Sequence, residues 1–326
     1  MASPQQKPFV CQTLPSEGCI LQIPPTPLVP VKLGPEEPLI WCKLEFLNPS
    51  GSTKDRIAAH ILGKAWRQGR LKKGDLVVEA SSGSTSIAMA MVCAQLGLRF
   101  IAIMPEGVSN ERSLIIRAFG GEVRKTPRDQ GIVGAIAETE RIAREERAFC
   151  PRQFENPENA EAHRFGTAHE IVSQLPGGTL EAFVSGVGTG GTLVGLYQGF
   201  RDQGIPAKPV AAIPIARGGD PSKGVGCFHA PETCCFSSRI PGVIERMSKI
   251  YQPDALEGIE ELEIEDETAL ATARKLIREG FPVGPSSGLN YAAALEIARR
   301  LGPGAVVVTV LPDRMERYFS TELFGC

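Results

Sequence analysis

Short apolar runs rich in valine and isoleucine alternate with longer stretches of helical period, after a proline-punctuated start that ends near Pro38. We expect strands over residues 40–47, 76–80, 100–104, 122–125, 182–185, 210–214, 262–264 and 305–311. We expect helices over residues 52–67, 85–96, 110–119, 132–146, 160–174, 192–201, 265–278 and 288–301. This order predicts an α/β protein with open, mostly parallel sheets flanked by helices.

One stretch interrupts the alternation. Residues 217–245 are irregular and rich in glycine, proline and cysteine. A long segment without strand or helix periodicity in a compact protein is usually a functional loop or a lid. We expect such a loop here.

Length and charge narrow the function classes. A chain of 326 residues has room for about two domains. Its 35 basic residues nearly balance 37 acidic ones, so a nucleic-acid partner has no electrostatic support. The sequence has no signal-peptide pattern and no apolar run of about 18 residues, so we expect a cytoplasmic protein without a membrane partner.

The metal-binding residue types suggest no metal site. Nine cysteines include no CxxC pair, and only Cys227, Cys234 and Cys235 leave a weak suggestion of a thiol or metal site. The four histidines are scattered along the chain: His60, His163, His169 and His229. The 35 glycines and 26 prolines are more informative, because much of the glycine collects in elbows between an expected strand and an expected helix.

The first elbow carries a lysine at a helix start. Residues 48–56 read NPSGSTKDR, and Lys54 would project from the first helical turn. The helix dipole and unpaired N–H groups disfavour an ammonium there. One interpretation is a lysine with a lowered pKa that can form an imine; the other is a solvated surface lysine.

The second elbow gathers hydroxyl groups. Residues 79–86 read EASSGSTS, with five hydroxyl residues around one glycine. Helix capping needs only one hydroxyl. Several free N–H and hydroxyl groups at a helix N-terminus also suit a carboxylate, so capping alone and anion binding are both open.

The third elbow, residues 184–192, contains G-x-G-x-x-G at Gly186, Gly188 and Gly191. A dinucleotide site would also need an acidic residue at the end of the next strand, and residues 213–215 read IPI. Backbone N–H groups with two threonine hydroxyls instead suit a single phosphate. The fourth elbow, residues 284–288, reads GPSSG and by itself is a helix cap.

In their order, these elbows resemble the motifs of the fold-type-II pyridoxal-phosphate enzymes, and among them the cysteine synthase (O-acetylserine sulfhydrylase) and cystathionine β-synthase family. Further similar motifs cover nearly the whole chain, at residues 26–29, 104–106, 111–112, 153–157, 311–313 and 316–321. The resemblance implies pyridoxal 5'-phosphate as cofactor and a two-domain, tryptophan-synthase-β-like fold. A smaller mobile domain would span residues 46–157, and a larger one residues 1–45 with 158–326, in a homodimer.

The resemblance also implies residue roles. Lys54 corresponds to the lysine that forms an imine with the cofactor and later transfers a proton. Ser286 corresponds to the serine at the pyridine nitrogen. The phosphate cup would comprise Gly188, Thr189, Gly190, Gly191 and Thr192. The substrate α-carboxylate would be held by Ser81, Ser82, Gly83, Thr85 and Gln153.

Several positions depart from the family pattern. The family's carboxylate loop usually reads TSGNTG, and its asparagine contacts the 3′ oxygen of the cofactor. Ser84 stands there, and we expect it to be a cofactor ligand, if necessary through a water. Residues 240–247 read IPGVIERM where the family has IQGIGAGF, which implies a changed second substrate or a changed balance of replacement and elimination.

The implied reaction is β-replacement on an O-activated serine, O-acetylserine or O-phosphoserine, through an aminoacrylate. A small nucleophile such as sulfide would complete it. One alternative is a β-lyase or cysteine desulfhydrase that releases sulfide, pyruvate and ammonia, and another is a nucleophile other than sulfide. A binding relative without activity is disfavoured by Lys54, the phosphate cup and Ser286. A nicotinamide enzyme is disfavoured by the missing acidic residue.

Overall fold

The computed structural model describes residues 23–216, 239–243 and 248–325. It also describes the backbone of three two-residue strands, β1 (Gln12–Thr13), β2 (Cys19–Ile20) and β10 (Cys235–Phe236). Most of the irregular stretch 217–245 lies outside the described residues. So do Cys227, Cys234 and His229, and residues 244–247 of the departing loop.

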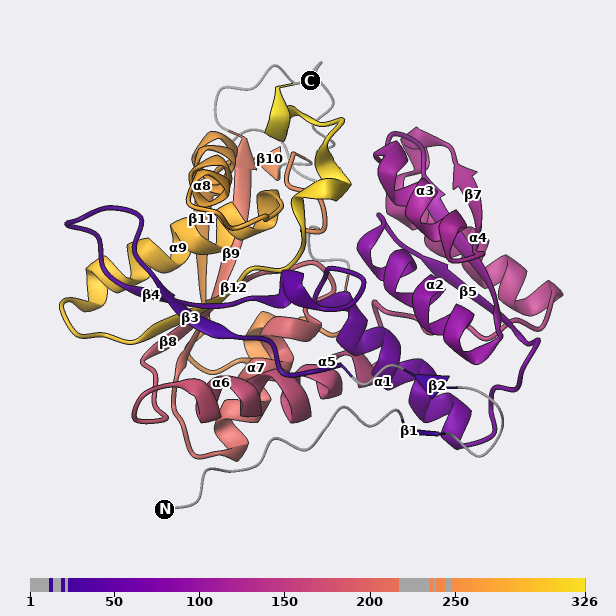
Figure 1. Ribbon diagram of the computed structural model, residues 1–326, viewed down its shortest axis with the longest axis horizontal. Coiled ribbons are helices and arrows are strands. Elements are labelled where there is room, and N and C mark those ends of the chain that lie inside the picture. Colours follow the sequence, from indigo (N-terminus) through magenta and orange to yellow (C-terminus); the bar gives the residue numbers. More distant parts are fainter. Residues whose placement is uncertain are drawn as a thin grey trace.

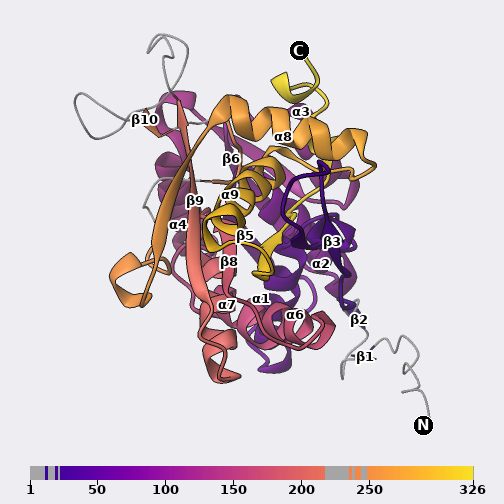
Figure 2. The same ribbon diagram turned by 90° about the vertical axis from the view of Figure 1, so that its left-hand side faces the viewer.

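The larger sheet has seven strands in the order β10-β9-β8-β12-β4-β3, with β11 beside β9. Their bounds are β3 Leu28–Val31, β4 Ile40–Lys43, β8 Ala182–Gly186, β9 Lys208–Ala216, β11 Glu260–Glu265 and β12 Val307–Val310. Only β3 and β10 run antiparallel to their neighbours. Figure 2 shows the long strands β9 and β11 side by side.

Helices cover both faces of this sheet. On one face lie α8 (Asp266–Arg278) and α9 (Pro285–Leu301), and on the other α6 (Ala168–Gln174) and α7 (Gly191–Asp202). Successive side chains of a strand point to opposite faces. Val184 accordingly packs in the core with Leu289, and its neighbour Phe183 packs in the other core with Leu193.

The smaller sheet consists of the parallel strands β5 (Leu76–Ala80), β6 (Arg99–Pro105) and β7 (Glu122–Thr126). Helices α1 (Lys54–Arg67) and α2 (Ser84–Leu96) pack on one face and α4 (Gly131–Glu145) on the other. Helix α3 (Asn110–Ala118) connects β6 with β7. In Figure 1 this smaller sheet and its helices stand beside the larger sheet, with α1 running between them.

The predicted α/β fold is confirmed, and burial on both sheet faces explains why strands such as β5 and β8 read as apolar runs without alternation. One expected strand is too long, and one observed strand was not expected. The strand expected over 40–47 ends at Lys43, and residues Glu45–Leu47 form a 3-10 turn, η1, that Asn48 closes by donating to the Glu45 carbonyl. Strand β3 was not expected because it contains Pro30, which an edge strand tolerates.

The helix expected over 160–174 is divided into three segments. It comprises α5 (Glu158–Ala162), a π turn over His163–Thr167 and α6. The π turn packs against α7, where Gly195 leaves no room for a Cβ beside the Ala160 carbonyl. In the described part of the chain, no helix is long and apolar enough to cross a membrane.

Candidate active site

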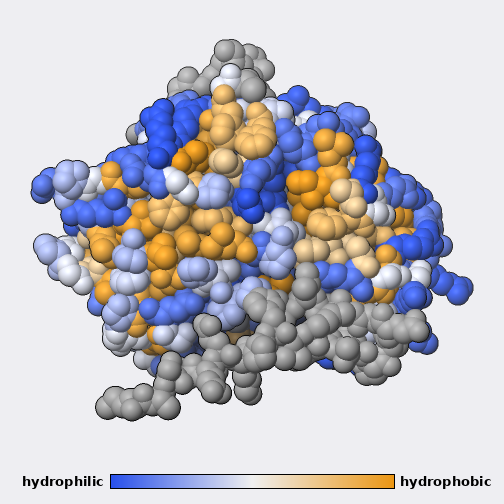
Figure 3. Space-filling model, in the orientation of Figure 1, coloured by the Kyte–Doolittle hydropathy of each residue, from blue (hydrophilic) through white to orange (hydrophobic). Residues whose placement is uncertain are grey.

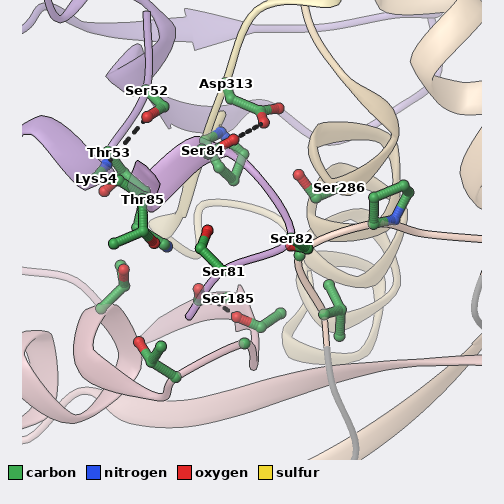
Figure 4. Close-up of a pocket in the computed structure, with 18 of the residues that line it drawn as sticks. Ser52, Thr53, Lys54, Ser81, Ser82, Ser84, Thr85, Ser185, Ser286 and Asp313 are labelled. Carbon is green, nitrogen blue, oxygen red and sulfur yellow. Dashed lines mark hydrogen bonds between the residues drawn. The ribbon is translucent and has the colours of Figure 1, made fainter. Parts of the chain in front are cut away.

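The elbows of both sheets converge on one pocket. It is lined by the start of α1, the β5–α2 and β8–α7 elbows, the start of α9 and the residues after β12. Figure 4 shows Lys54, Ser82, Ser84 and Ser286 around it. The structure thus brings together eleven of the predicted site residues: Lys54, Ser81, Ser82, Ser84, Thr85, Gln153, Gly188, Thr189, Gly190, Thr192 and Ser286.

Two predicted residues, Gly83 and Gly191, do not line the pocket. Gly83 has φ +142°, a conformation that favours glycine, and its Cα lies against the Arg112 side chain. Gly191 lies against the Asn159 amide, which occupies the space a Cβ would take. Both glycines therefore allow a neighbouring side chain to pack closely against its elbow on the side away from the pocket.

Lys54 lies in the first turn of α1, as the sequence predicted, although the helix begins at Lys54 and not at residue 52. Among the described residues its Nζ has no hydrogen-bond or ion-pair partner. Burial lowers the pKa of Lys54, and the charges of Asp313 and Glu45 oppose part of that shift. The alternative of a solvated surface lysine is therefore wrong, because the amine lies in the pocket.

A buried charge network supports the helix behind this lysine. Arg56, the third residue of α1, donates to Glu45 at 2.7 Å and to Glu170 at 2.6 Å. Burial alone would raise the pKa of Glu45, but the Arg56 guanidinium lowers it to about 2. Glu45 remains ionised in this network, and Arg56 joins the start of α1 to Glu45 in η1 and to Glu170 in α6.

The hydroxyl groups of the second elbow have different partners. Ser81 Oγ accepts hydrogen bonds from the N–H groups of Gly83 (2.9 Å) and Ser86 (3.4 Å). Both its lone pairs are occupied, so its proton remains available to the pocket. The backbone N–H groups of Ser82, Ser84 and Thr85 have no acceptor among the described residues.

Thr85 and Gln153 are bonded to each other. Thr85 Oγ1 donates to Gln153 Oε1 at 2.6 Å, and Gln153 Nε2 donates to the Ala80 carbonyl. The buried Glu79 carboxylate accepts the backbone N–H groups of Ala80 and Gln153, and burial raises its pKa to about 8. One Nε2 proton of Gln153 is left for a ligand.

Ser84 donates its only proton away from the pocket centre. Its Oγ lies 3.0 Å from Asp313 Oδ2, which also accepts the Tyr318 hydroxyl at 2.7 Å (Figure 4). Ser84 therefore presents only lone pairs to a ligand while this bond stands. The sequence expectation that Ser84 binds the cofactor stays a prediction, restricted to an acceptor role.

The third elbow forms a cradle of N–H groups. Gly190, at φ +82°, directly precedes α7. The N–H groups of Gly188, Thr189, Gly190 and Thr192 have no acceptor among the described residues. Unpaired N–H groups at a helix N-terminus form an anion site, which agrees with the predicted phosphate cradle.

The remaining predicted residues complete the lining. Thr192 Oγ1 lies 3.3 Å from Nε2 of the buried His163, whose Nδ1 contacts Thr167, and burial lowers the pKa of His163 to about 3. Ser286, the second residue of α9, has a hydroxyl without a partner in the described part of the chain. No group of three metal-ligating side chains is present among the described residues.

Comparison with known proteins now decides the family. The family model described as "Pyridoxal-phosphate dependent enzyme" matches residues 20–313. The chain belongs to this family. A cysteine synthase of Staphylococcus aureus (strain N315) is 39% identical over 295 residues, which cover 88% of this pyridoxal-phosphate-dependent enzyme and 89% of the relative.

Solved structures of relatives share the fold of this pyridoxal-phosphate-dependent enzyme. O-ureido-L-serine synthase is 34% identical with a TM-score of 0.80 over 93% of each chain. An O-acetylserine-dependent cystathionine β-synthase from Helicobacter pylori is 33% identical, with a TM-score of 0.79 over 93% of this chain and 96% of that one. A hydrogen sulfide-producing enzyme from Fusobacterium nucleatum is 34% identical, with a TM-score of 0.78 over 92% of this chain and 87% of that one.

The pocket of this pyridoxal-phosphate-dependent enzyme fits its cofactor. An amine without a partner, a cradle of unpaired N–H groups and an unpartnered serine hydroxyl line the same cavity. These match the aldehyde, the phosphate and the pyridine nitrogen of pyridoxal phosphate in chemical type. Lys54, the 188–192 cradle and Ser286 are thus the groups that would hold it.

Sequence reasoning gave no role to two residues of the site. Asp313 follows β12, where polar residues at the carboxyl end of a parallel strand usually face a ligand crevice. That position was the available signal. Asn159 stands two residues beyond the QFENP motif (residues 153–157), and its contacts depend on the packing of α5 against α7, for which the sequence carries no local signal.

Proposed function

We propose that this enzyme catalyses β-replacement on an O-activated serine, as cysteine synthases do. One observation carries the proposal: the free amine of Lys54 shares a pocket with two separate cradles of unpaired N–H groups. One cradle suits a phosphate and the other a carboxylate. The cysteine synthase relative and the O-acetylserine-dependent neighbour support this substrate class.

The β5–α2 elbow would bind the α-carboxylate of the amino acid. Its donors are the free N–H groups of Ser82, Ser84 and Thr85, with the Ser81 and Ser82 hydroxyls. The remaining Nε2 proton of Gln153 adds another donor. Thr85 acts through Gln153, because its own proton is already donated there.

Pyridoxal phosphate, when bound, supplies the electron sink that stabilises negative charge at the substrate Cα. Lys54, whose pKa burial lowers and whose neutral form is thereby favoured, would accept the Cα proton. Asp313, whose negative charge favours the protonated lysine, lies on the same side of the pocket. Closure of the pocket would keep water from the reacting carbon.

A sulfide-releasing β-lyase is the second candidate. The neighbouring hydrogen sulfide-producing enzyme favours it, and the O-ureido-L-serine synthase neighbour keeps a nucleophile other than sulfide open. Pro241, Gly242 and Val243, the start of the segment that departs from the family pattern, line the pocket. We infer that this segment helps select the nucleophile.

We also propose the organisation expected from the sequence. Residues 46–157 would move as a smaller domain against residues 1–45 with 158–326, and two copies would form a cytoplasmic homodimer. Exposed large apolar side chains such as Leu47, Leu114 and Phe319 would favour contact with a second copy. Figure 3 shows apolar areas on both sides of a more polar band on one face.

Product analysis tests the function. The holoenzyme is incubated with O-acetylserine or O-phosphoserine, with and without sulfide, and separately with cysteine alone. Cysteine, pyruvate and sulfide are then measured. β-replacement predicts cysteine that depends on sulfide, whereas a β-lyase predicts pyruvate and sulfide from cysteine alone. Absence of both cysteine and pyruvate, at the level of a Lys54→Ala control and from every substrate tested, would contradict both.

A further inference from the structure

Asn159 joins two parts of the active site that lie far apart in the sequence. It is the second residue of α5, and it is only 1% exposed. Nδ2 lies 2.8 Å from the Gln153 carbonyl oxygen and 2.9 Å from Thr189 Oγ1. A carbonyl oxygen can only accept, so the atom that faces it is the NH2 group, and both contacts are donated by Asn159.

This orientation determines the direction of the Thr189 hydroxyl. Thr189 Oγ1 accepts from Asn159 and, at 3.4 Å, from the Gly191 N–H. With both lone pairs occupied, its proton must go to a different acceptor. Thr189 lines the pocket beside the unpaired N–H groups of the 188–192 cradle, where a phosphate oxygen is the acceptor that fits.

The same amide fixes Gln153 through its backbone. The carbonyl of Gln153 accepts from Asn159, and its N–H donates to Glu79 at 3.1 Å. The backbone N–H and carbonyl of Gln153 are therefore both fixed by side-chain hydrogen bonds. Ser248 reinforces the link, because its hydroxyl contacts the carbonyls of both Phe154 and Thr189.

We propose that Asn159 is a positioning residue that sets Thr189 as a hydrogen-bond donor to the cofactor phosphate and couples this cradle to Gln153. The inference rests on the proposed function for the role of Gln153, and on the family's cofactor for the role of Thr189. It also explains Gly191, which stays outside the pocket because the Asn159 amide fills the space beside its Cα.

The test compares two forms of the cofactor. Apoenzyme of the wild type and of Asn159→Asp is titrated with pyridoxal phosphate and with pyridoxal, which has the aldehyde but no phosphate, and absorbance gives each affinity. The introduced carboxylate can accept but cannot donate, so it would take the Thr189 proton. We expect affinity for pyridoxal phosphate to fall about ten- to hundredfold and affinity for pyridoxal to stay within about twofold.

Asn156→Asp is the matched control. Asn156 belongs to the same segment, but its Nδ2 donates to the Pro151 carbonyl, outside the pocket. It should bind both ligands as the wild type does. Should Asn159→Asp fail to fold, Asn159→Ser carries the same test, since a serine keeps one proton to donate, and a smaller loss specific to the phosphate is expected.

Equal losses for pyridoxal phosphate and pyridoxal would overturn the proposal, because they would indicate general disruption of the fold. Unchanged binding of both would overturn it as well. Thr189→Val supplies a further check: combined with Asn159→Asp, it should add little loss, since both changes remove one donor. A normal phosphate-specific effect without turnover of any serine derivative would reject the proposed function alone.

Discussion

The hydroxyl groups around the pocket differ in where their protons go. Ser81 and Thr189 each accept two N–H groups, which leaves the hydroxyl proton for a ligand. Ser84 and Thr85 donate their protons to Asp313 and Gln153. Residues of one chemical type, three of them in the motif EASSGSTS, therefore have different tasks.

Removal of the Thr85 hydroxyl tests this distinction. Thr85→Val keeps the shape of the side chain but releases Gln153 Oε1, so the Gln153 amide can turn away from the carboxylate. We expect KM for the amino-acid substrate to rise about five- to thirtyfold, while affinity for pyridoxal phosphate stays unchanged. Steady-state kinetics and a cofactor titration measure the two quantities.

Thr85→Ser, which restores the hydroxyl, is the control and should recover most of the affinity. Gln153→Leu should raise KM less in the Thr85→Val enzyme than in the wild type, because the two residues act as a pair. A KM effect of Thr85→Val that is independent of Gln153 would show that Thr85 contacts the substrate directly.

At the scale of elements, the segment α5–π turn–α6 places His163 beside the phosphate cradle. The buried His163 stays neutral, since burial lowers its pKa to about 3. In the unfolded chain its pKa is about 6.5. Between pH 7 and pH 5 only the unfolded state gains this proton, so acidification destabilises the fold.

We therefore expect the free energy of unfolding of the wild type to fall by about 2 kcal/mol more than that of His163→Gln between pH 7 and pH 5. Urea unfolding of both holoenzymes at the two pH values measures the difference. His169→Gln is the control, because His169 is an exposed residue of α6, and it should follow the wild type. Equal pH dependence of wild type and His163→Gln would show that His163 gains its proton in the folded state as well.

The sequence predicted elements best where one local cause determines them. Strand β5 is predicted with its observed bounds because a short apolar run, LVVEA, ends at a glycine-containing elbow. Strand β3 is not predicted because it contains Pro30, although its partner β4 follows it closely in the chain. The π turn is not predicted, since it depends on packing against α7, a partner distant in sequence. Asp313 and Asn159 acquire their roles in the same way, from contacts with Ser84 and Thr189.

At the scale of the molecule, the two sheets are joined beside the site by α3 and the segment after β12. Glu111 accepts both the N–H and the hydroxyl of Ser320 at 2.9 Å, and Ser109 donates to the Arg317 carbonyl at 2.7 Å. The Arg112 guanidinium lies 4.9 Å from the Tyr318 ring centre. These contacts are placed to respond to any movement of the smaller sheet.

If substrate binding closes the proposed smaller domain, these contacts should tighten. We expect an amino acid without a leaving group, L-alanine, to slow hydrogen exchange of residues 317–321 in the holoenzyme, as measured by mass spectrometry. Glu111→Ala should abolish the slowing. Glu122→Ala, at an exposed residue of β7, should retain it. If L-alanine does not change the hydrogen-exchange rate of residues 317–321 in the wild type, closure at this contact is contradicted.

The role of Lys54 is the central claim, and one chemical measurement addresses it. Sodium borohydride reduces the bond between pyridoxal phosphate and the lysine that holds it, and peptide mass mapping then identifies that lysine. The account predicts the label on the peptide that contains Lys54 and its loss in Lys54→Ala. A label on another lysine, such as the buried Lys43, or no label on the holoenzyme, would contradict it.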